Sequence, residues 1–303
     1  MNQYDVYLYG MSVLTTMHLL KDKFPELDGY GEIKETYRFP GGETGNSAVA
    51  LSSFGCSVKI AGTYLGKNTK DILIDYFNQR NVDTTSLYYD DTFDGLEDLV
   101  IIDQKTRTVF GRFQAYFSDP KSCKRWNTPS KEDILAAKVV GLDPFFSEES
   151  CAVARLCKEL GKKYVVIDCE PDSEMHRYAA ATIISNEFVK NTFPNRDIEE
   201  LYRAYTNASN GLVIFTFGSR EIYYGRKNEP INKMKPYEVE VKSTLGAGDT
   251  FKAGVLYGIL KEMQDKEIVS FAAATAGFVC AHFPLALNPP TVDQIYCIMN
   301  REK

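Results

Sequence analysis

Residues 243–261 read Ser243-Thr-Leu-Gly-Ala-Gly-Asp-Thr-Phe-Lys-Ala-Gly-Val-Leu-Tyr-Gly-Ile-Leu-Lys261, a turn of small residues that runs into an apolar pattern. Downstream of the turn, apolar side chains recur every three to four residues, which predicts a buried helix. Upstream, residues 237–241 alternate between apolar and charged side chains and predict a strand. The stretch therefore predicts a strand, a tight turn and a helix in direct succession.

Small residues fill the turn ahead of this helix. Gly246 and Gly248 lack the Cβ atoms that would keep a ligand from the backbone, and Ala247 adds little bulk, so several amides can converge on one anion. Asp249 follows in the first helical turn, where a carboxylate is favourable even without a function. Beside a phosphate-sized cradle, however, a carboxylate can take a hydroxyl proton while the amides bind the developing charge. These are the requirements of phosphoryl transfer.

The turn resembles the Asp-Thr-x-Gly-Ala-Gly-Asp signature of the ribokinase family, the PfkB-type carbohydrate kinases. Ser243 replaces the first Asp of that signature, and the matching positions are Thr244, Gly246, Ala247, Gly248 and Asp249. The resemblance implies that Asp249 is the catalytic base and that the amides of residues 246–248 form the anion hole. It also implies that Thr244 lies on the nucleotide side and that ATP with Mg²⁺ is the phosphoryl donor.

The composition is that of an ordinary soluble protein. Of the 303 residues 44% are apolar and 25% are charged, and no apolar run approaches the ~18 residues of a membrane span. No basic region precedes an apolar core at the N-terminus, so we expect no signal peptide and a cytoplasmic location. The net charge of −6 argues against nucleic-acid binding. The seven cysteines and three histidines are scattered and predict neither disulfides nor a zinc site. The expected partner is a small molecule.

Two segments in the first half of the chain predict the acceptor site. Gly41 and Gly42 are followed four residues later by Asn46, which matches the first signature of the same family. Where the family carries a substrate-gripping Asp, five residues after Gly10, this chain has Thr15. The resemblance implies that Thr15, Gly41, Gly42 and Asn46 contact the substrate, although by themselves these segments also suit a surface loop and a turn before a helix at 47–54.

The middle of the chain alternates between helices at 131–138, 148–160 and 173–180 and strands at 139–143, 164–168 and 182–185. Such alternation predicts parallel strands joined by crossover helices. Strand-like runs at 32–39, 99–103 and 108–114, the last two separated by polar residues 104–107, interrupt this pattern and by themselves also suit an edge of the main sheet. The resemblance implies one three-layer α/β/α domain over residues 1–303 with a mostly parallel central sheet. Its small β lid comes from about 30–40 and 97–115. Lid strands in the family often pair between subunits, which leaves a monomer and a homodimer both open.

The nucleotide side is predicted from residues 211–225, a buried strand that returns as a hairpin. The family has a Thr-x-Gly turn here against the nucleotide phosphates, which implies Thr216, Gly218 and Ser219. Asn186 fits the Asn-x-x-Glu motif of relatives, but Val189 replaces the Glu that helps to organise Mg²⁺. The sequence therefore leaves the metal ligands unassigned.

The favoured function is ATP-dependent phosphorylation of a hydroxyl group on a small molecule, with a sugar as the first choice of acceptor. Because Thr15 replaces the gripping Asp, a nucleoside or a vitamin-like alcohol is retained as an alternative. A catalytically silent binding or regulatory protein on a kinase scaffold is the second alternative, since Thr15, Asn68, Val189 and Ser243 all depart from the family pattern. A dinucleotide-dependent oxidoreductase is disfavoured because no Gly-x-Gly-x-x-Gly motif follows the first strand.

Overall fold

The computed structural model describes residues 3–103, 107–117 and 124–301. A nine-stranded sheet forms its centre, in the order β13-β12-β11-β10-β9-β8-β1-β4-β5. All neighbours from β11 to β5 pair in parallel, whereas β12 and β13 are antiparallel. The strands are β1 (Tyr4–Gly10), β4 (Val58–Gly62), β5 (Val82–Ser86), β8 (Ala137–Leu142), β9 (Lys163–Ile167), β10 (Ala181–Ser185), β11 (Leu212–Thr216), β12 (Ile222–Gly225) and β13 (Asn232–Met234).

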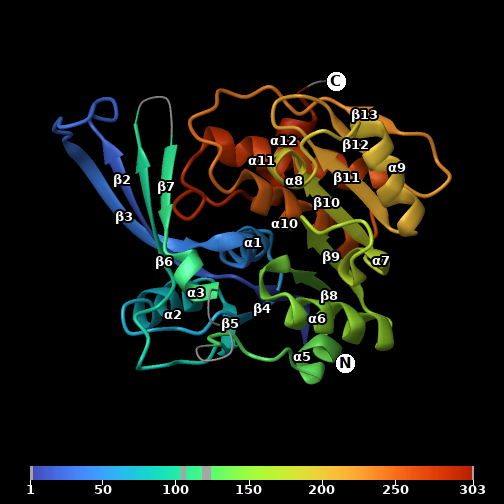
Figure 1. The fold of residues 1–303 in the computed structure, drawn as a ribbon, viewed down its shortest axis with the longest axis horizontal. Coiled ribbons are helices and arrows are strands. Elements are labelled where there is room, and N and C mark those ends of the chain that lie inside the picture. The colour runs from blue at the N-terminus through green and yellow to red at the C-terminus, as the bar shows by residue number, and fades with distance from the viewer. Residues whose placement is uncertain (1–2, 104–106, 118–123, 302–303) are drawn as a thin grey trace.

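Helices cover both faces of this sheet (Figure 1). One face packs against α1 (Gly42–Ser53), α2 (Lys70–Asn78), α10 (Ala247–Leu260), α11 (Asp265–Ala281) and α12 (Val292–Met299). The other packs against α5 (Lys131–Ala136), α6 (Glu148–Glu159), α7 (Glu174–Arg177), α8 (Asn186–Thr192) and α9 (Ile198–Ala208). The predicted three-layer α/β/α fold with a mostly parallel sheet is confirmed.

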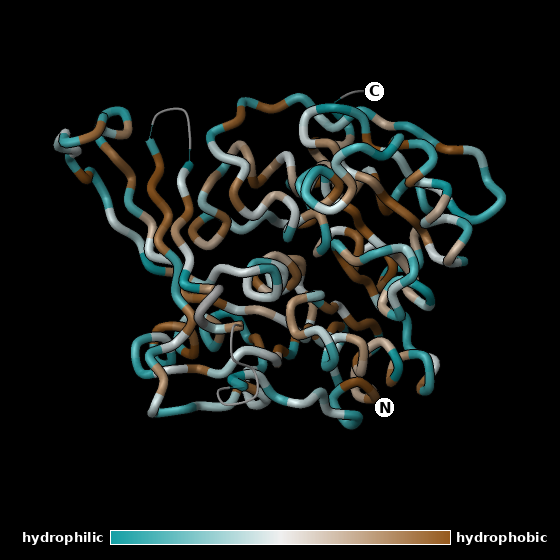
Figure 2. Tube along the Cα trace, in the orientation of Figure 1, coloured by the Kyte–Doolittle hydropathy of each residue, from teal (hydrophilic) through white to brown (hydrophobic). Residues whose placement is uncertain are grey.

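The central strands are apolar on both faces. In β1, Val6 and Leu8 belong to the core under α1 and α10, whereas Tyr7 and Tyr9 belong to the core under α5 and α6. All four side chains are buried, because a parallel sheet with helices on both sides leaves no face to water. In Figure 2, hydrophobic segments accordingly follow the central strands, and hydrophilic ones follow the outer loops.

A second, four-stranded sheet projects at one side of the molecule (Figure 1). Its order is β3-β2-β6-β7, with β2 (Val13–Leu20), β3 (Ile33–Gly41), β6 (Glu97–Ile102) and β7 (Arg107–Gly111). The strands β3, β6 and β7 lie within the segments predicted as a lid. Strand β2 was not predicted, because Val13, Leu14 and Thr15 are all buried and obscure the alternation of a half-exposed strand. We call this sheet the lid.

Several predicted boundaries are wrong. Strand β7 ends at Gly111 and a short helix, α3 (Phe113–Phe117), follows, because its aromatic rings pack against Trp126. Of the polar residues 104–107 that separate the two predicted strands, only residue 107 lies within the described residues, and it belongs to β7. Helix α1 begins at Gly42 instead of residue 47, and α5 ends before β8 at Ala137.

The strand predicted at 237–241 is also absent from the described residues, which are irregular there. This segment crosses helix α11, where the hydroxyl of Tyr237 hydrogen-bonds to that of Ser270 and Val239 faces Gly277. The alternation in the sequence therefore reflects packing of one side against a helix, not pairing in a sheet. No helix in the described residues has the length and apolar character needed to cross a membrane.

Candidate active site

The predicted turn leads into helix α10 as expected. Gly246 precedes the helix with a φ of 76°, a left-handed conformation that glycine adopts without strain. No side chain in the described residues caps the first amides of α10. The hydroxyl of Thr250 bonds backward to the carbonyl of Gly246 at 2.9 Å, and a Cβ built on Gly248 would meet nothing within 4 Å. The amide of Ala247 donates to the carbonyl of Thr244 at 3.3 Å, so the start of α10 presents to open space the next amide, that of Gly248.

Asp249 lies in the first turn of α10 and is held by helix α1. The side-chain amide of Asn46 donates to its Oδ2 at 2.6 Å, and the hydroxyl of Ser47 donates to its backbone carbonyl at 3.1 Å. Burial raises the pKa of Asp249, while the hydrogen bond from Asn46 opposes that rise and the charge of Asp143 adds to it. A carboxylate with a raised pKa is a stronger base than an ordinary aspartate.

A cavity of about 180 Å³ opens beside Asp249. Four predicted acceptor residues, Thr15, Gly41, Gly42 and Asn46, line it together with Asp249. The glycine pair permits this convergence, because a Cβ on Gly41 would lie 2.0 Å from the Thr15 hydroxyl and Gly42 has a φ of 76°. The remaining wall is largely apolar and includes Phe39, Val100, Phe113, Phe145, Leu245 and Phe283. We call this space the acceptor cavity.

Two carboxyl groups of the acceptor cavity were not predicted, Glu43 and Asp98. Burial raises the pKa of Glu43 well above its usual range; the charge of Asp143 adds to this rise and that of Lys252 opposes it. Burial likewise raises the pKa of Asp98 to about 6, against the effect of the Thr15 hydroxyl. Glu43 could have been suspected from its position inside the Gly-Gly signature, whereas nothing near Asp98 in the sequence indicates a site.

A buried ion pair lies behind the catalytic turn. Lys252, one helical turn after Asp249, pairs with Asp143 at the end of β8, and both side chains are completely buried. The second oxygen of Asp143 accepts from the amide of Met11 at 2.8 Å and from the hydroxyl of Thr44 at 3.0 Å. Although burial disfavours its charge, the pKa of Lys252 is raised, because the neighbouring carboxylates outweigh the loss of water. A lone lysine in an apolar helical pattern was the sequence signal for this pair.

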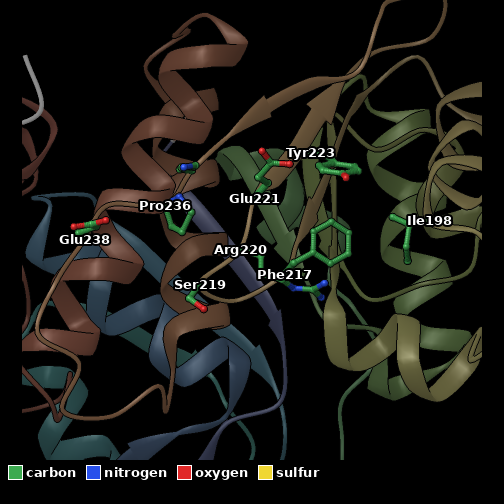
Figure 3. Close-up of a pocket in the computed structure, with 9 residues that line it drawn as sticks. Ile198, Phe217, Ser219, Arg220, Glu221, Tyr223, Pro236 and Glu238 are labelled. Carbon is green, nitrogen blue, oxygen red and sulfur yellow. The ribbon is translucent and has the colours of Figure 1, made fainter.

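Only some of the residues that were predicted to bind the nucleotide lie close together. A second cavity, of about 530 Å³, is lined by Ser219 and its neighbours Phe217 and Arg220, as Figure 3 shows. Thr216 ends β11, and Gly218 has a φ of 67° with open space where a Cβ would stand. The remaining lining residues are Ile198, Glu221, Tyr223, Lys235, Pro236 and Glu238. We call this space the second cavity.

The other four predicted nucleotide residues, Thr216, Gly218, Asn186 and Thr244, line neither cavity. Asn186 starts helix α8, and its side-chain oxygen accepts from the guanidinium of Arg220 at 3.1 Å, which links it to the second cavity. Thr244 is exposed in the turn before α10, where its carbonyl accepts from the amide of Ala247 at 3.3 Å. Thr244 therefore contributes its backbone to the turn that precedes α10.

The structure offers no dedicated metal cage in its described part. No three His, Cys, Asp or Glu side chains gather there to hold an ion. Val189 is buried among Ile184, Leu201 and Val213, so its position on α8 faces the core. Asp168 accepts from the amide and the hydroxyl of Ser185, at 2.7 and 2.8 Å, and burial raises its pKa to about 6.

Comparison with known proteins assigns the family. Over 299 residues the chain is 22% identical to the 5-dehydro-2-deoxygluconokinase of Clostridium botulinum (strain Alaska E43 / Type E3), which covers 88% of this chain and 85% of that protein. A ribokinase-like protein from Agrobacterium tumefaciens superposes with a TM-score of 0.87 at 17% identity, over 99% of this chain and 98% of its own.

Arabidopsis thaliana ribokinase, in complex with ribose and ATP, superposes with a TM-score of 0.78 at 15% identity, over 99% of both chains. At such identities the two structures show a shared fold. The family model described as pfkB family carbohydrate kinase matches residues 11–291, nearly the whole chain. This protein therefore belongs to the pfkB family of carbohydrate kinases.

Proposed function

We propose that this protein transfers the γ-phosphoryl group of ATP to a hydroxyl group of a small polyhydroxylated acceptor, with a sugar as the first choice. The observation that carries the proposal is the position of Asp249. Its carboxylate is at once a lining group of the acceptor cavity and a member of the first turn of α10, beside unblocked amides. The base and the anion site that phosphoryl transfer needs thus adjoin one another.

The start of α10 suits a phosphate group. Its uncapped amides, the positive end of the helix dipole and the open space over Gly248 together fit an anion. The second cavity is lined by Ser219, a residue that the family resemblance implies for the nucleotide, and by Arg220, which supports this cavity as the nucleotide site. The ATP bound by Arabidopsis ribokinase, a protein of the same fold, supports ATP as the donor.

The proposed chemistry uses this chain's own groups at each step. The carboxylate of Asp249, held by Asn46, accepts the proton of the acceptor hydroxyl as its oxygen attacks the γ-phosphorus. The new O–P bond forms while the bond between the γ-phosphorus and the β–γ bridging oxygen breaks, and ADP leaves. The amides of Gly246 and Gly248 stabilise charge on the transferring group, an effect of about 3 kcal/mol for one well-placed donor. The amide of Ala247 joins them once its bond to the carbonyl of Thr244 opens.

Magnesium is part of the proposal as a companion of ATP. Mg²⁺ keeps several waters and binds through one or two carboxylates plus the phosphates, so a site without a protein cage suits it. The carboxylates proposed for it are Asp168 and Asp249, and the charge of Asp249 contributes to the raised pKa of Asp168. When bound, the ion neutralises developing charge on the phosphates.

The test is acceptor-dependent formation of ADP. The protein is incubated with ATP and Mg²⁺ against a panel of pentoses, hexoses, nucleosides and vitamin-like alcohols, and both ADP and the phosphorylated acceptor are measured. One acceptor that yields both products in equal amounts supports the proposal and separates sugar from nucleoside. Binding of ATP without turnover on any acceptor would instead support a silent ligand-binding protein.

We also propose that the lid pairs between two copies of the chain. Three apolar side chains on the lid, Ile33, Val109 and Phe110, are each about half exposed, at 48%, 45% and 50%. Pairing of lids would bury this surface, and its apolar contribution would favour the dimer. Sedimentation of the wild type and of Phe110→Ser tests this, since the variant should shift the population toward monomer.

A further inference from the structure

We propose that Glu43 and Asp98 select the acceptor by charge: they grip a neutral or amine-bearing polyhydroxylated compound and exclude acceptors that carry a carboxylate or phosphate group. In this proposal Asp98, on the neighbouring lid strand, supplies the carboxylate that is missing at position 15, where this chain has Thr15. The inference rests on the proposed function only in taking the acceptor cavity as the substrate site.

The lid brings Asp98 to the position opposite Thr15. Strands β2 and β6 run in parallel, and in their register Thr15 pairs directly with Asp98. Both residues line the acceptor cavity. A carboxyl group is therefore present beside the place where the sequence has only a hydroxyl, but it comes from a strand more than eighty residues further along the chain.

Both carboxyl groups have an oxygen that is shielded from water and unpaired. Oε2 of Glu43 and Oδ1 of Asp98 are buried, and neither has a hydrogen-bond partner within the described residues. Such unpaired buried acceptors are rare and destabilising. Because both groups line the same cavity, a ligand that donates hydrogen bonds to them would relieve the cost.

No positive charge among the described lining residues offsets these carboxylates, since none of those residues is Lys, Arg or His. Lys252, behind the cavity, is paired with Asp143. Arg107 is exposed at the start of β7 and lies outside the lining, although its charge reaches Asp249. An acceptor in the cavity therefore meets three carboxyl groups, those of Glu43, Asp98 and Asp249, and no cationic side chain in the described lining.

This arrangement discriminates between acceptors by simple electrostatics. An added carboxylate or phosphate would face like charges in a space partly closed to water, where repulsion is stronger than in solution. Hydroxyl groups donate to carboxylates without that cost, and an ammonium group gains a charge-assisted bond. The pKa of Asp98, raised to about 6, leaves this group charged at neutral pH. The pKa of Glu43 is raised well above its usual range, which favours its neutral form in the empty cavity, so the repulsion of an anionic acceptor comes first from Asp98.

The test is direct binding, measured by calorimetry without ATP and so independent of turnover. The probes are ribose, fructose and glucose, each compared with an amino counterpart, a sugar-acid counterpart and a phosphorylated counterpart. We expect every acid and phosphate to bind at least ten-fold more weakly than its neutral or amino relative. The proposal is overturned if an anionic probe binds as tightly as its neutral relative, or if no neutral or amino probe binds.

The variants Glu43→Gln and Asp98→Asn keep shape and remove charge. We expect each to weaken binding of the preferred probe roughly ten- to a hundred-fold, the usual effect of a hydrogen bond to a charged group, and to narrow the discrimination against acids. In a kinase assay the acceptor KM should rise more than kcat falls. Unchanged discrimination in both variants would overturn the proposal.

An exchange of the residues at positions 15 and 98 tests the role of Asp98 separately. Asp98→Thr should lose affinity, and the double variant Thr15→Asp with Asp98→Thr should recover it, because the two positions are paired in register. A merely structural role for Asp98 would give no recovery. If the binding pattern holds but no probe yields ADP, the proposed kinase function fails while this inference stands. If an acid is the best acceptor and yields ADP, the proposed kinase function is supported and this inference fails.

Discussion

Asn46 donates its side-chain amide to the carboxylate of Asp249 at 2.6 Å, across 203 positions of sequence. Asn46 comes from the helix that follows the first glycine signature, and Asp249 comes from the helix that follows the second. The bond joins the two halves of the predicted site and orients the proposed base toward the acceptor cavity.

Asp249→Asn should reduce turnover by roughly 10²- to 10⁴-fold, because asparagine cannot accept the hydroxyl proton. ATP should still bind, since the backbone amides are unchanged, and stability should change by less than about 1 kcal/mol, since asparagine serves nearly as well at a helix start. Acceptor-dependent ADP formation and the melting temperature, measured together, distinguish a catalytic base from a residue that only caps the helix. Asp71→Asn, in the first turn of α2, is the matched control. Wild-type turnover in Asp249→Asn would sink the mechanism.

The pH dependence of kcat/KM should show an acid limb at higher pH than an ordinary aspartate gives, because burial raises the pKa of Asp249. The hydrogen bond from Asn46 stabilises the charged form, so Asn46→Ala should raise that pKa further. The acid limb of the variant should therefore move to higher pH, with a lower rate at neutral pH. A limb that stays in place would show that another group sets it.

The sequence predicted the catalytic turn because its signals are local. Glycines at 246 and 248 and an acid at 249 determine the conformation and chemistry of one helix start. It also predicted that Thr15 and Asn46 belong to one site. Asp98 and Lys252 were missed because their roles arise only when distant strands and helices pack together, whereas Glu43 lies beside the glycine pair and its local signal was overlooked.

The strand that was missed and the strand that was wrongly predicted are errors with the same kind of cause. Strand β2 lost its alternating pattern because successive residues, from Val13 to Thr15, are buried on both sides of the lid. Residues 237–241 alternate without pairing, because they lie on helix α11. The hydrophobic period of a segment shows which of its residues are exposed to solvent. It indicates a strand only where the buried residues belong to a sheet.

Gly248→Ala and Gly248→Val should lower turnover in steps, because their side chains enter the open space where the phosphate is proposed to bind. We expect a loss on the order of 10²- to 10³-fold for valine, comparable to removal of an anion-hole donor. Melting temperatures should stay near the wild type, since a Cβ there meets no protein atom within 4 Å. If valine left turnover intact, the anion-hole assignment would be wrong.

Lys252→Met should destabilise the protein by about 3–5 kcal/mol, because it leaves the buried carboxylate of Asp143 without its partner. The matched control is Lys131→Met, which breaks an exposed pair with Glu159 and should cost less than about 1 kcal/mol. Denaturant unfolding measures both. Equal effects of the two substitutions would show that the buried pair contributes no more than a surface pair.

Asp98→Asn should make the free protein more stable at pH 8, by roughly 1 kcal/mol once its partial exposure is allowed for. The reason is that the pKa of Asp98 is raised to about 6 in the folded state, so the folded protein favours the protonated form. The stability that this preference gives is fully present below pH 4 and is lost as the pH rises through 6. Asparagine removes the penalty, so the gain should be large at pH 8 and small at pH 4.5.

Melting curves of the wild type and Asp98→Asn at the two pH values measure this difference, with the exposed Asp91→Asn as the control. The same substitution should weaken acceptor binding, so stability and affinity should move in opposite directions. That opposition is expected of a carboxylate kept unpaired for a ligand, because the group costs stability until the ligand binds. A variant that lost both stability and affinity would show instead that Asp98 supports the lid, and the acceptor would then have to be gripped by Glu43 and Asp249 alone.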